Sequence, residues 1–197
     1  MRSSMNLHAL LDFAGLAICS VYATIPLFWL TVHPLIAHWR SAGRRAYFAL
    51  LPLWFVYALA AFAIGWRYRQ VHLYVSWMSW VPAVLFILMG FTLYQAAGQS
   101  FGRAKISGLA ELEPAKHSQE LVTTGIRAKV RHPIYLGHFC EMFGWMLGSG
   151  SLALAGMLVF FSTLGVLMIR REDAELEQRF GDAFRRYRAT VPSFLPR

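Results

Sequence analysis

The sequence predicts an all-α, polytopic membrane protein with about five transmembrane helices, a C-terminal helical hairpin and an amphipathic interfacial C-terminal helix. Of the 197 residues, 57% are hydrophobic and only 15% are charged, which leaves too little polar surface to cover a water-soluble globule. Long uncharged runs recur along the chain and share one apolar body. We therefore expect a single membrane domain over residues 1–197.

Three uncharged runs in residues 1–97 predict the first three spans. Each has the roughly 20 residues that cross about 30 Å of hydrocarbon at about 1.5 Å per residue. The runs are Phe13–Val32, Ala46–Trp66 and Leu73–Ala97. Pro82 lies inside the third run and predicts a kink there. The first run is longer than the apolar core of a signal peptide, so we expect an uncleaved span.

The second half of the chain predicts a loop, a hairpin and a surface helix. Closely spaced charges indicate an extramembrane loop over residues 98–132. The apolar runs Pro133–Leu147 and Ser151–Ile169, separated by Gly-Ser-Gly, predict a transmembrane hairpin over 133–169. In residues 170–197, apolar side chains recur at helical spacing among arginines, which is typical of an amphipathic interfacial helix. These apolar residues are Leu176, Phe180, Phe184, Tyr187 and Val191.

The distribution of basic residues predicts the orientation in the membrane. Of the 19 Lys and Arg, only Arg2, Arg67 and Arg69 fall on the side of the N-terminus. Positively charged loops stay in the cytosol, so we expect the N-terminus outside and the C-terminus in the cytosol. This placement also accounts for the net charge of +9, and we expect no nucleic-acid partner. Cys19 and Cys140 lie in apolar runs without metal or redox spacing.

A short motif, Arg131–Gly137, lies where the fourth span begins. It reads Arg-His-Pro-Ile-Tyr-Leu-Gly, with the proline at a first helical position and free backbone N–H groups around it, and such a helix end binds anions. The same residues also fit a purely topogenic role, with Arg131 at the headgroups, Tyr135 in the aromatic belt and Gly137 in helix packing. Both interpretations stay open.

Two ionisable residues, His138 and Glu141, lie one helical turn apart inside the fourth apolar run. Charged groups in membrane helices face bundle interiors or wet cavities, so both are candidates for handling a substrate. The alternative is a structural His–Glu pair that locks this helix against the third span. A metal site is not expected, because a third ligand at helical spacing is missing.

An acidic pair, Glu172 and Asp173, follows two arginines at the exit of the fifth span. These carboxylates suit ribose hydroxyls or a cationic sulfonium group. The alternative is a solvated helical turn, which we prefer for the later residues Glu175 and Glu177.

The order of these pieces resembles the isoprenylcysteine carboxyl methyltransferase family. The resemblance covers residues 85–197 and includes Leu121–Gly125, the Arg131–Gly137 motif, the hairpin, the acidic pair and the ending Val-Pro-Ser-Phe-Leu-Pro. It implies an S-adenosylmethionine-dependent methyltransferase acting on a lipophilic or lipid-anchored acceptor, first of all a prenylcysteine-type carboxylate. It implies contact with membrane lipids as well.

Carried over by position, the resemblance implies specific site residues. Those for cofactor binding are Gln119, Leu121, Val122, Gly125, His132, Tyr135, Gly137, Glu172 and Asp173. The resemblance also implies that Arg131 stabilises the site or an anionic group. His138 and Glu141, singled out by their place in the fourth apolar run, join Arg131 as the residues expected for catalysis. The chain departs from the family pattern at three points: Arg127 stands where an aromatic residue is usual, Gln119 where a His is often found, and Asp173 where a second Glu is usual.

Other functions stay open beside this one. Related membrane enzymes methylate phospholipid amines or small thiols, and such acceptors must lose a proton, in which case His138 or Glu141 would take part. Sterol-type reductases with a nicotinamide cofactor resemble the same C-terminal half, but this chain is short for that group. A non-catalytic membrane scaffold is the third possibility.

Overall fold

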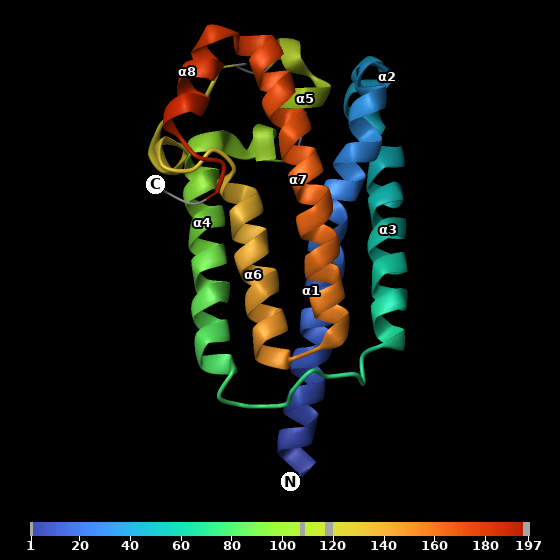
Figure 1. Ribbon diagram of the computed structural model, residues 1–197. Coiled ribbons are helices and arrows are strands. Elements are labelled where there is room, and N and C mark those ends of the chain that lie inside the picture. The colour runs from blue at the N-terminus through green and yellow to red at the C-terminus, as the bar shows by residue number, and fades with distance from the viewer. Residues whose placement is uncertain (1, 107–108, 117–119, 195–197) are drawn as a thin grey trace.

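The computed structural model describes residues 2–106, 109–116 and 120–194, and the regular structure in these ranges is helical. The elements are α1 (Arg2–Val32), η1 (His33–Leu35), α2 (Ile36–Ala42), η2 (Gly43–Ala46), α3 (Tyr47–Arg67), α4 (Trp80–Ile106), α5 (Leu109–Leu112), η3 (Pro114–Lys116), η4 (Gly125–Ala128), α6 (Pro133–Ser149), α7 (Leu152–Phe180) and α8 (Asp182–Thr190). The long helices α1, α3, α4, α6 and α7 run alongside one another in alternating directions (Figure 1). The prediction of an all-α fold is confirmed for these residues.

Three helical segments of the described chain are long and apolar enough to cross a membrane: Leu7–Arg67, Trp80–Gln99 and Leu152–Phe180. The first contains both α1 and α3, which fold back on each other at α2 (Figure 1). Large apolar side chains on α3 and α4 are exposed, among them Leu51, Phe55, Leu59, Leu85 and Leu88. The protein is therefore a membrane protein. The number of five spans stays a prediction, since α6 has only 17 residues.

The third long helix has different bounds from the predicted span. α4 begins at Trp80 rather than Leu73 and continues to Ile106, well into the predicted loop. Gln, Ala, Arg and Lys end an apolar run but are good helix formers, so the helix outlasts the apolar segment. Pro82 lies in the first turn of α4, where its missing N–H has no helical partner to lose, so it does not interrupt the helix as predicted.

The last long helix also passes its predicted end. α7 continues from Leu152 to Phe180 without a break at Ile169, because no Gly or Pro occurs between Ile169 and Gly181. Gly181 has φ +54°, a conformation that favours glycine, and the chain turns there. The separate amphipathic helix is thus only α8, whose Phe184 is fully buried.

Glycines allow α4 and α6 to pack at very short distance. A Cβ added at Gly90 would lie 2.6 Å from the backbone oxygen of Gly137 and 2.5 Å from Cγ of Glu141. A Cβ at Gly144 would lie 2.7 Å from the backbone oxygen of Ala83. Small residues commonly let membrane helices approach in this way. This contact fixes the depth and rotation of α6, which carries four residues of the predicted site: Tyr135, Gly137, His138 and Glu141.

We expect Gly90→Ala to destabilise the protein by about 1–3 kcal/mol, because the new methyl group meets backbone that cannot move aside. Thermal unfolding of detergent-purified protein measures the change. Gly156→Ala on α7 is the control, since a Cβ there meets nothing within 4 Å. Equal melting temperatures for the two variants would show that the contact is looser than described.

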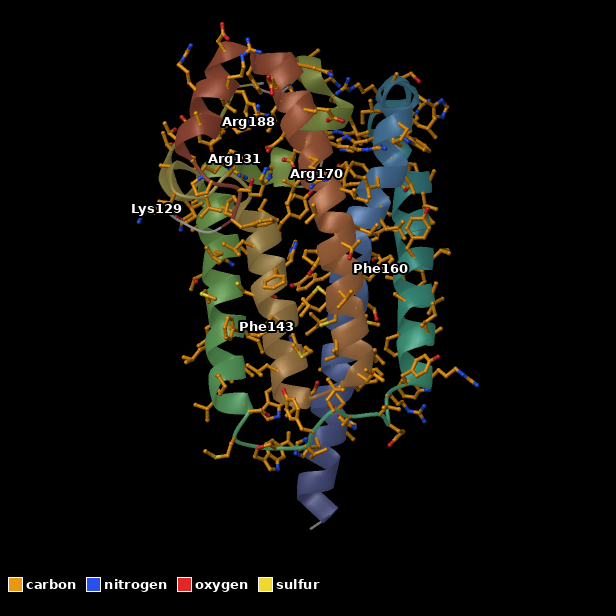
Figure 2. All side chains as sticks on the ribbon, in the orientation of Figure 1. Lys129, Arg131, Phe143, Phe160, Arg170 and Arg188 are labelled. Atoms are coloured by element: carbon orange, nitrogen blue, oxygen red, sulfur yellow. The ribbon has the colours of Figure 1, made fainter. Side chains whose placement is uncertain are left out.

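The connecting segments with most of the basic residues gather at one end of the bundle. α2, α5 and α8 lie at this end, and the N-terminus lies at the other (Figure 1). Arg131, Arg170 and Arg188 lie toward the same end, whereas Phe143 and Phe160 lie along the middle of the bundle (Figure 2). A separation of basic and apolar residues of this kind is what the positive-inside rule requires. Which end faces the cytosol stays a prediction.

We expect a reporter fused after residue 197 to be active in the cytosol and a reporter fused before residue 1 to be active outside. Paired fusions to a periplasmic and a cytoplasmic reporter enzyme test both ends. A cytosolic N-terminus together with an external C-terminus would contradict the charge-based orientation.

Candidate active site

A cavity of about 1760 Å³ lies inside the basic end of the bundle. Its polar lining comes from the loop before α6, the later part of α7 and α8, and includes Arg127, Arg131, His132, Glu172 and Tyr187. Its apolar lining comes mainly from α1 and α3 and includes Val21, Ile25, Phe28, Leu50 and Trp54. Sites for single small ligands are commonly about 300–1,000 Å³, so this cavity has room for two ligands.

A buried ion pair joins the start of α6 to α7. Nη2 of Arg131 lies 2.7 Å from Oδ2 of Asp173, and the two side chains are 8% and 14% exposed. Arg131 also donates to Oγ of Ser193 at 2.7 Å and to the backbone oxygen of Val191. The backbone N–H of Arg131 donates to the oxygen of Pro192. The segment after α8 is therefore fastened to the first residues of α6.

His132 lies between the two acidic residues of α7. Its Nε2 donates to Oδ1 of Asp173 at 2.9 Å, and its Nδ1 lies 3.6 Å from Oε2 of Glu172. Burial opposes the charged form, but the hydrogen bonds to Asp173 and Glu172 outweigh it and raise the pKa of His132 to about 9. The imidazolium is thus the main form at neutral pH, and it holds both carboxylates in place.

The neighbouring carboxylates have different surroundings. Glu172 lines the cavity, with its side chain 32% exposed. Asp173 does not line the cavity, and both of its oxygens bond to Arg131 and His132. Successive helical residues point about 100° apart, which explains the division. Glu172 can meet a ligand, whereas Asp173 positions the residues that do. Neither is a freely solvated side chain.

The charge on His132 predicts a pH dependence of stability. The folded-state pKa of about 9 exceeds the ordinary value of 6.5, so the stabilisation is fully present below pH 6.5 and is lost as the pH rises through 9. We expect melting temperatures to fall across this window, with a total effect of about 3 kcal/mol. His132→Gln should show a flatter profile between pH 6.5 and 9.5. An identical slope in this variant would assign the loss to another group.

The loop before α6 contributes a buried arginine that sequence reasoning missed. Arg127 is only 7% exposed, lines the cavity, and donates to the backbone oxygen of Arg131 at 3.0 Å. The hydroxyl of Tyr187 donates to the backbone oxygen of Arg127 at 2.7 Å. Sequence analysis treated Arg127 only as a departure from an aromatic residue. An arginine at a position where the family usually has an aromatic ring was the available signal that Arg127 has a role of its own.

The other residues of this loop divide between the cavity and its support. Leu121 and Val122 line the cavity, as expected for residues that contact a ligand. Gly125 does not line it, and its φ of +63° begins the short helix that carries Arg127. Gln119 lies outside the described residues.

Deeper in α6, His138 lines the cavity and Glu141 does not. His138 is 6% exposed, and its ring lies between those of Tyr22 and Tyr94, with centroids 4.5 and 5.7 Å away. The hydroxyl of Tyr22 donates to Oε2 of Glu141 at 2.9 Å. Glu141 therefore pairs with α1, not with His138 as the structural alternative required. The tyrosine inside the first apolar run indicated a hydroxyl that needs a partner, but the sequence did not indicate which partner.

Of the two remaining residues of the predicted site, one lines the cavity and the other does not. Tyr135 lines the cavity one turn from His132. Gly137 faces α4, where its added Cβ would meet the backbone oxygen of Gly90 at 3.0 Å, and it does not line the cavity. The helix-packing interpretation of Gly137 fits this position.

The chain matches the family described as phospholipid methyltransferase over residues 78–183. It is 36% identical to protein-S-isoprenylcysteine O-methyltransferase of Schizosaccharomyces pombe over 51% of this chain and 40% of the relative. It is 32% identical to the nickel-cobalt-cadmium resistance protein NccN of Alcaligenes xylosoxydans xylosoxydans over 60% of this chain and 53% of the relative. The alignments thus span about half the length of these curated relatives or less. No solved structure matches the chain.

Proposed function

Because the chain belongs to the phospholipid methyltransferase family, we propose that it transfers a methyl group from S-adenosylmethionine to the polar group of a lipophilic acceptor. The observation that carries the proposal is the two-sided cavity, which joins a charged end beside His132 and Glu172 to an apolar wall made by α1 and α3. A charged, water-soluble donor and an apolar acceptor need two such environments within one space.

The residues of the charged end fit the methyl donor. S-adenosylmethionine supplies a methyl group activated by the positive charge of its sulfonium. Glu172 presents a carboxylate for a cation or for ribose hydroxyls, while Arg127 supplies a buried cation for a carboxylate. Leu121 and Val122 line the same end and exclude water. Asp173 does not touch the donor but positions His132, and through Arg131 it holds the start of α6.

The apolar wall fits the tail of the acceptor. Phe28, Leu50 and Trp54 line it, so a hydrocarbon chain would bury its surface there while the polar group reaches toward the charged end. The fission-yeast relative is named for an acceptor of this type, and a prenylcysteine carboxylate is the acceptor that the resemblance implied. An ionised carboxylate needs no base, and alignment would supply most of the rate enhancement.

Two measurements on detergent-purified protein test the proposal. We expect saturable binding of S-adenosylmethionine and no comparable binding of NADPH. We also expect transfer of a labelled methyl group from S-adenosylmethionine into the lipid-soluble fraction of added membranes. Binding of NADPH alone would favour the reductase, and binding of neither would favour the scaffold.

A further inference from the structure

A second pocket, of about 580 Å³, lies beside the large cavity at the basic end of the bundle. It is formed between the turn that joins α1 to α3 and the segment of α5 and η3. α5 packs against α2 and η2 there, and the buried Leu112 forms part of the wall. Four cations and one carboxylate give the described lining a formal charge of +3. The charged residues of this basic pocket are Arg40, Arg44, Arg45, Glu113 and Lys116.

The carboxylate of Glu113 does not neutralise the basic pocket. Its two oxygens pair with Arg44 at 3.3 Å and with Lys116 at 3.0 Å. These two basic side chains are nevertheless 70% and 71% exposed, whereas the side chain of Glu113 is only 12% exposed. Arg45 is exposed and has no ion-pair partner in the described part of the chain. The accessible surface of the pocket is therefore cationic, and an anion can bond to its arginines.

The basic pocket lies where the chain enters the membrane. α3 begins at Tyr47, two residues after Arg45, and continues as an apolar helix. Trp39 and Tyr47 pack against the buried apolar cluster that includes Leu112, a wall residue of the pocket. Tryptophan and tyrosine are enriched at the level of the lipid headgroups. The arginines of the pocket are therefore at the height of the phosphates of the surrounding lipid.

An exposed apolar face of α3 continues from the basic pocket into the membrane. Its residues are separated by three, four and four positions, which places them on one side of the helix, and Phe48 is 86% exposed. From the first to the last of them the helix rises about 16 Å, close to half of a hydrocarbon layer of about 30 Å. A lipid tail can follow this face through one leaflet. The residues are Phe48, Leu51, Phe55 and Leu59.

We propose that the basic pocket binds the phosphate of an anionic phospholipid whose tails lie against α3. The planar guanidinium groups of Arg44 and Arg45 match phosphate oxygens in geometry. Basic pockets between membrane helices bind anionic headgroups in this way. A free phosphate ion would meet the same arginines but would gain nothing from the apolar face.

The bound lipid is a partner of the protein and is not methylated. Arg40 and Arg44 line both the basic pocket and the large cavity, so the lipid lies next to the cavity without filling it. The inference does not depend on the proposed methyl transfer, and either can fail without the other.

Native mass spectrometry of the detergent-purified protein tests the site with phosphatidylglycerol, phosphatidylcholine with the same tails, and inorganic phosphate. We expect saturable binding of phosphatidylglycerol, much weaker binding of phosphatidylcholine and no displacement of the lipid by millimolar phosphate. Arg44→Gln combined with Arg45→Gln should weaken phosphatidylglycerol binding by about 10–30-fold, the effect of two basic residues near a headgroup. Arg45→Gln alone, which breaks no ion pair of the described residues, should weaken it by about fivefold and serves in case the double variant disturbs folding.

Arg170→Gln combined with Arg171→Gln is the matched control. Both arginines are exposed and line neither the basic pocket nor the large cavity, and Arg170 lies toward the same end of the bundle (Figure 2). The control variant loses the same charge and should keep its affinity for phosphatidylglycerol. Four results would overturn the inference: equal binding of the two lipids, equal losses in the two double variants, unchanged affinity in a folded Arg45→Gln protein, or displacement of the lipid by phosphate.

Discussion

Asp173→Asn is expected to lower the free energy of unfolding by about 3–5 kcal/mol, the range for breaking a buried ion pair by removing one partner. The carboxylate neutralises Arg131, whose side chain is only 8% exposed, and it also bonds to His132. Asparagine keeps the shape but leaves Arg131 without its carboxylate and His132 with Glu172 alone. Denaturation of detergent-purified protein, followed by loss of helical signal, measures the change.

Glu177→Gln is the matched control for this experiment. Glu177 also lies on α7 and pairs with two arginines, Arg185 and Arg188, but these are 53% and 44% exposed. Exposed pairs contribute about 0–1 kcal/mol, so a small effect is expected. If the two variants lose the same free energy of unfolding, the buried pair between Arg131 and Asp173 stabilises the protein no more than the exposed pairs of Glu177 do.

Glu172→Gln is expected to weaken S-adenosylmethionine binding by about 1.5–3 kcal/mol, the range for a hydrogen bond to a charged group. Glu172 is the carboxylate that lines the cavity, so the loss should appear in affinity more than in stability. Isothermal titration of the purified variant gives the affinity, and its melting temperature gives the stability.

The neighbouring position provides the contrast. Asp173→Asn should reduce stability and affinity together, whereas Glu172→Gln should reduce affinity alone. Glu177→Gln changes a side chain that does not line the cavity, so it should change neither appreciably. Unchanged affinity in a well-folded Glu172→Gln protein would remove this residue from the donor site.

Elements with local signals were predictable from the sequence. The hairpin begins at Pro133 as expected, and α6 ends at Ser149, two residues after the predicted Leu147 and just before Gly150, which has a left-handed φ of +65°. The bounds of α4 and α7 were not predictable in the same way. The length of an apolar run depends on the thickness of the membrane. The length of a helix depends on where a residue such as Gly181 breaks it.

The site was predictable only where its residues are close in sequence. His132 and Tyr135 belong to the short motif Arg131–Gly137, which is recognisable in the sequence, and both residues line the cavity. The bond between Tyr22 and Glu141 joins residues 119 positions apart, and no local pattern encodes such a contact. The different directions of Glu172 and Asp173 depend on the rotation of α7, which the packing of the whole bundle determines.

The fastening of the C-terminal segment onto α6 has a consequence for biosynthesis. The backbone N–H groups of Arg131 and His132 donate to the backbone oxygens of Pro192 and Ser193, and Nη2 of Arg131 donates to Oγ of Ser193. Both acceptor residues are translated after α7 and α8. The ribosome therefore finishes the helices before it delivers the residues that complete the donor end. In a nascent chain halted after α7, Arg131 and His132 would lack these partners, so the charged end of the cavity is complete only after translation has passed Ser193.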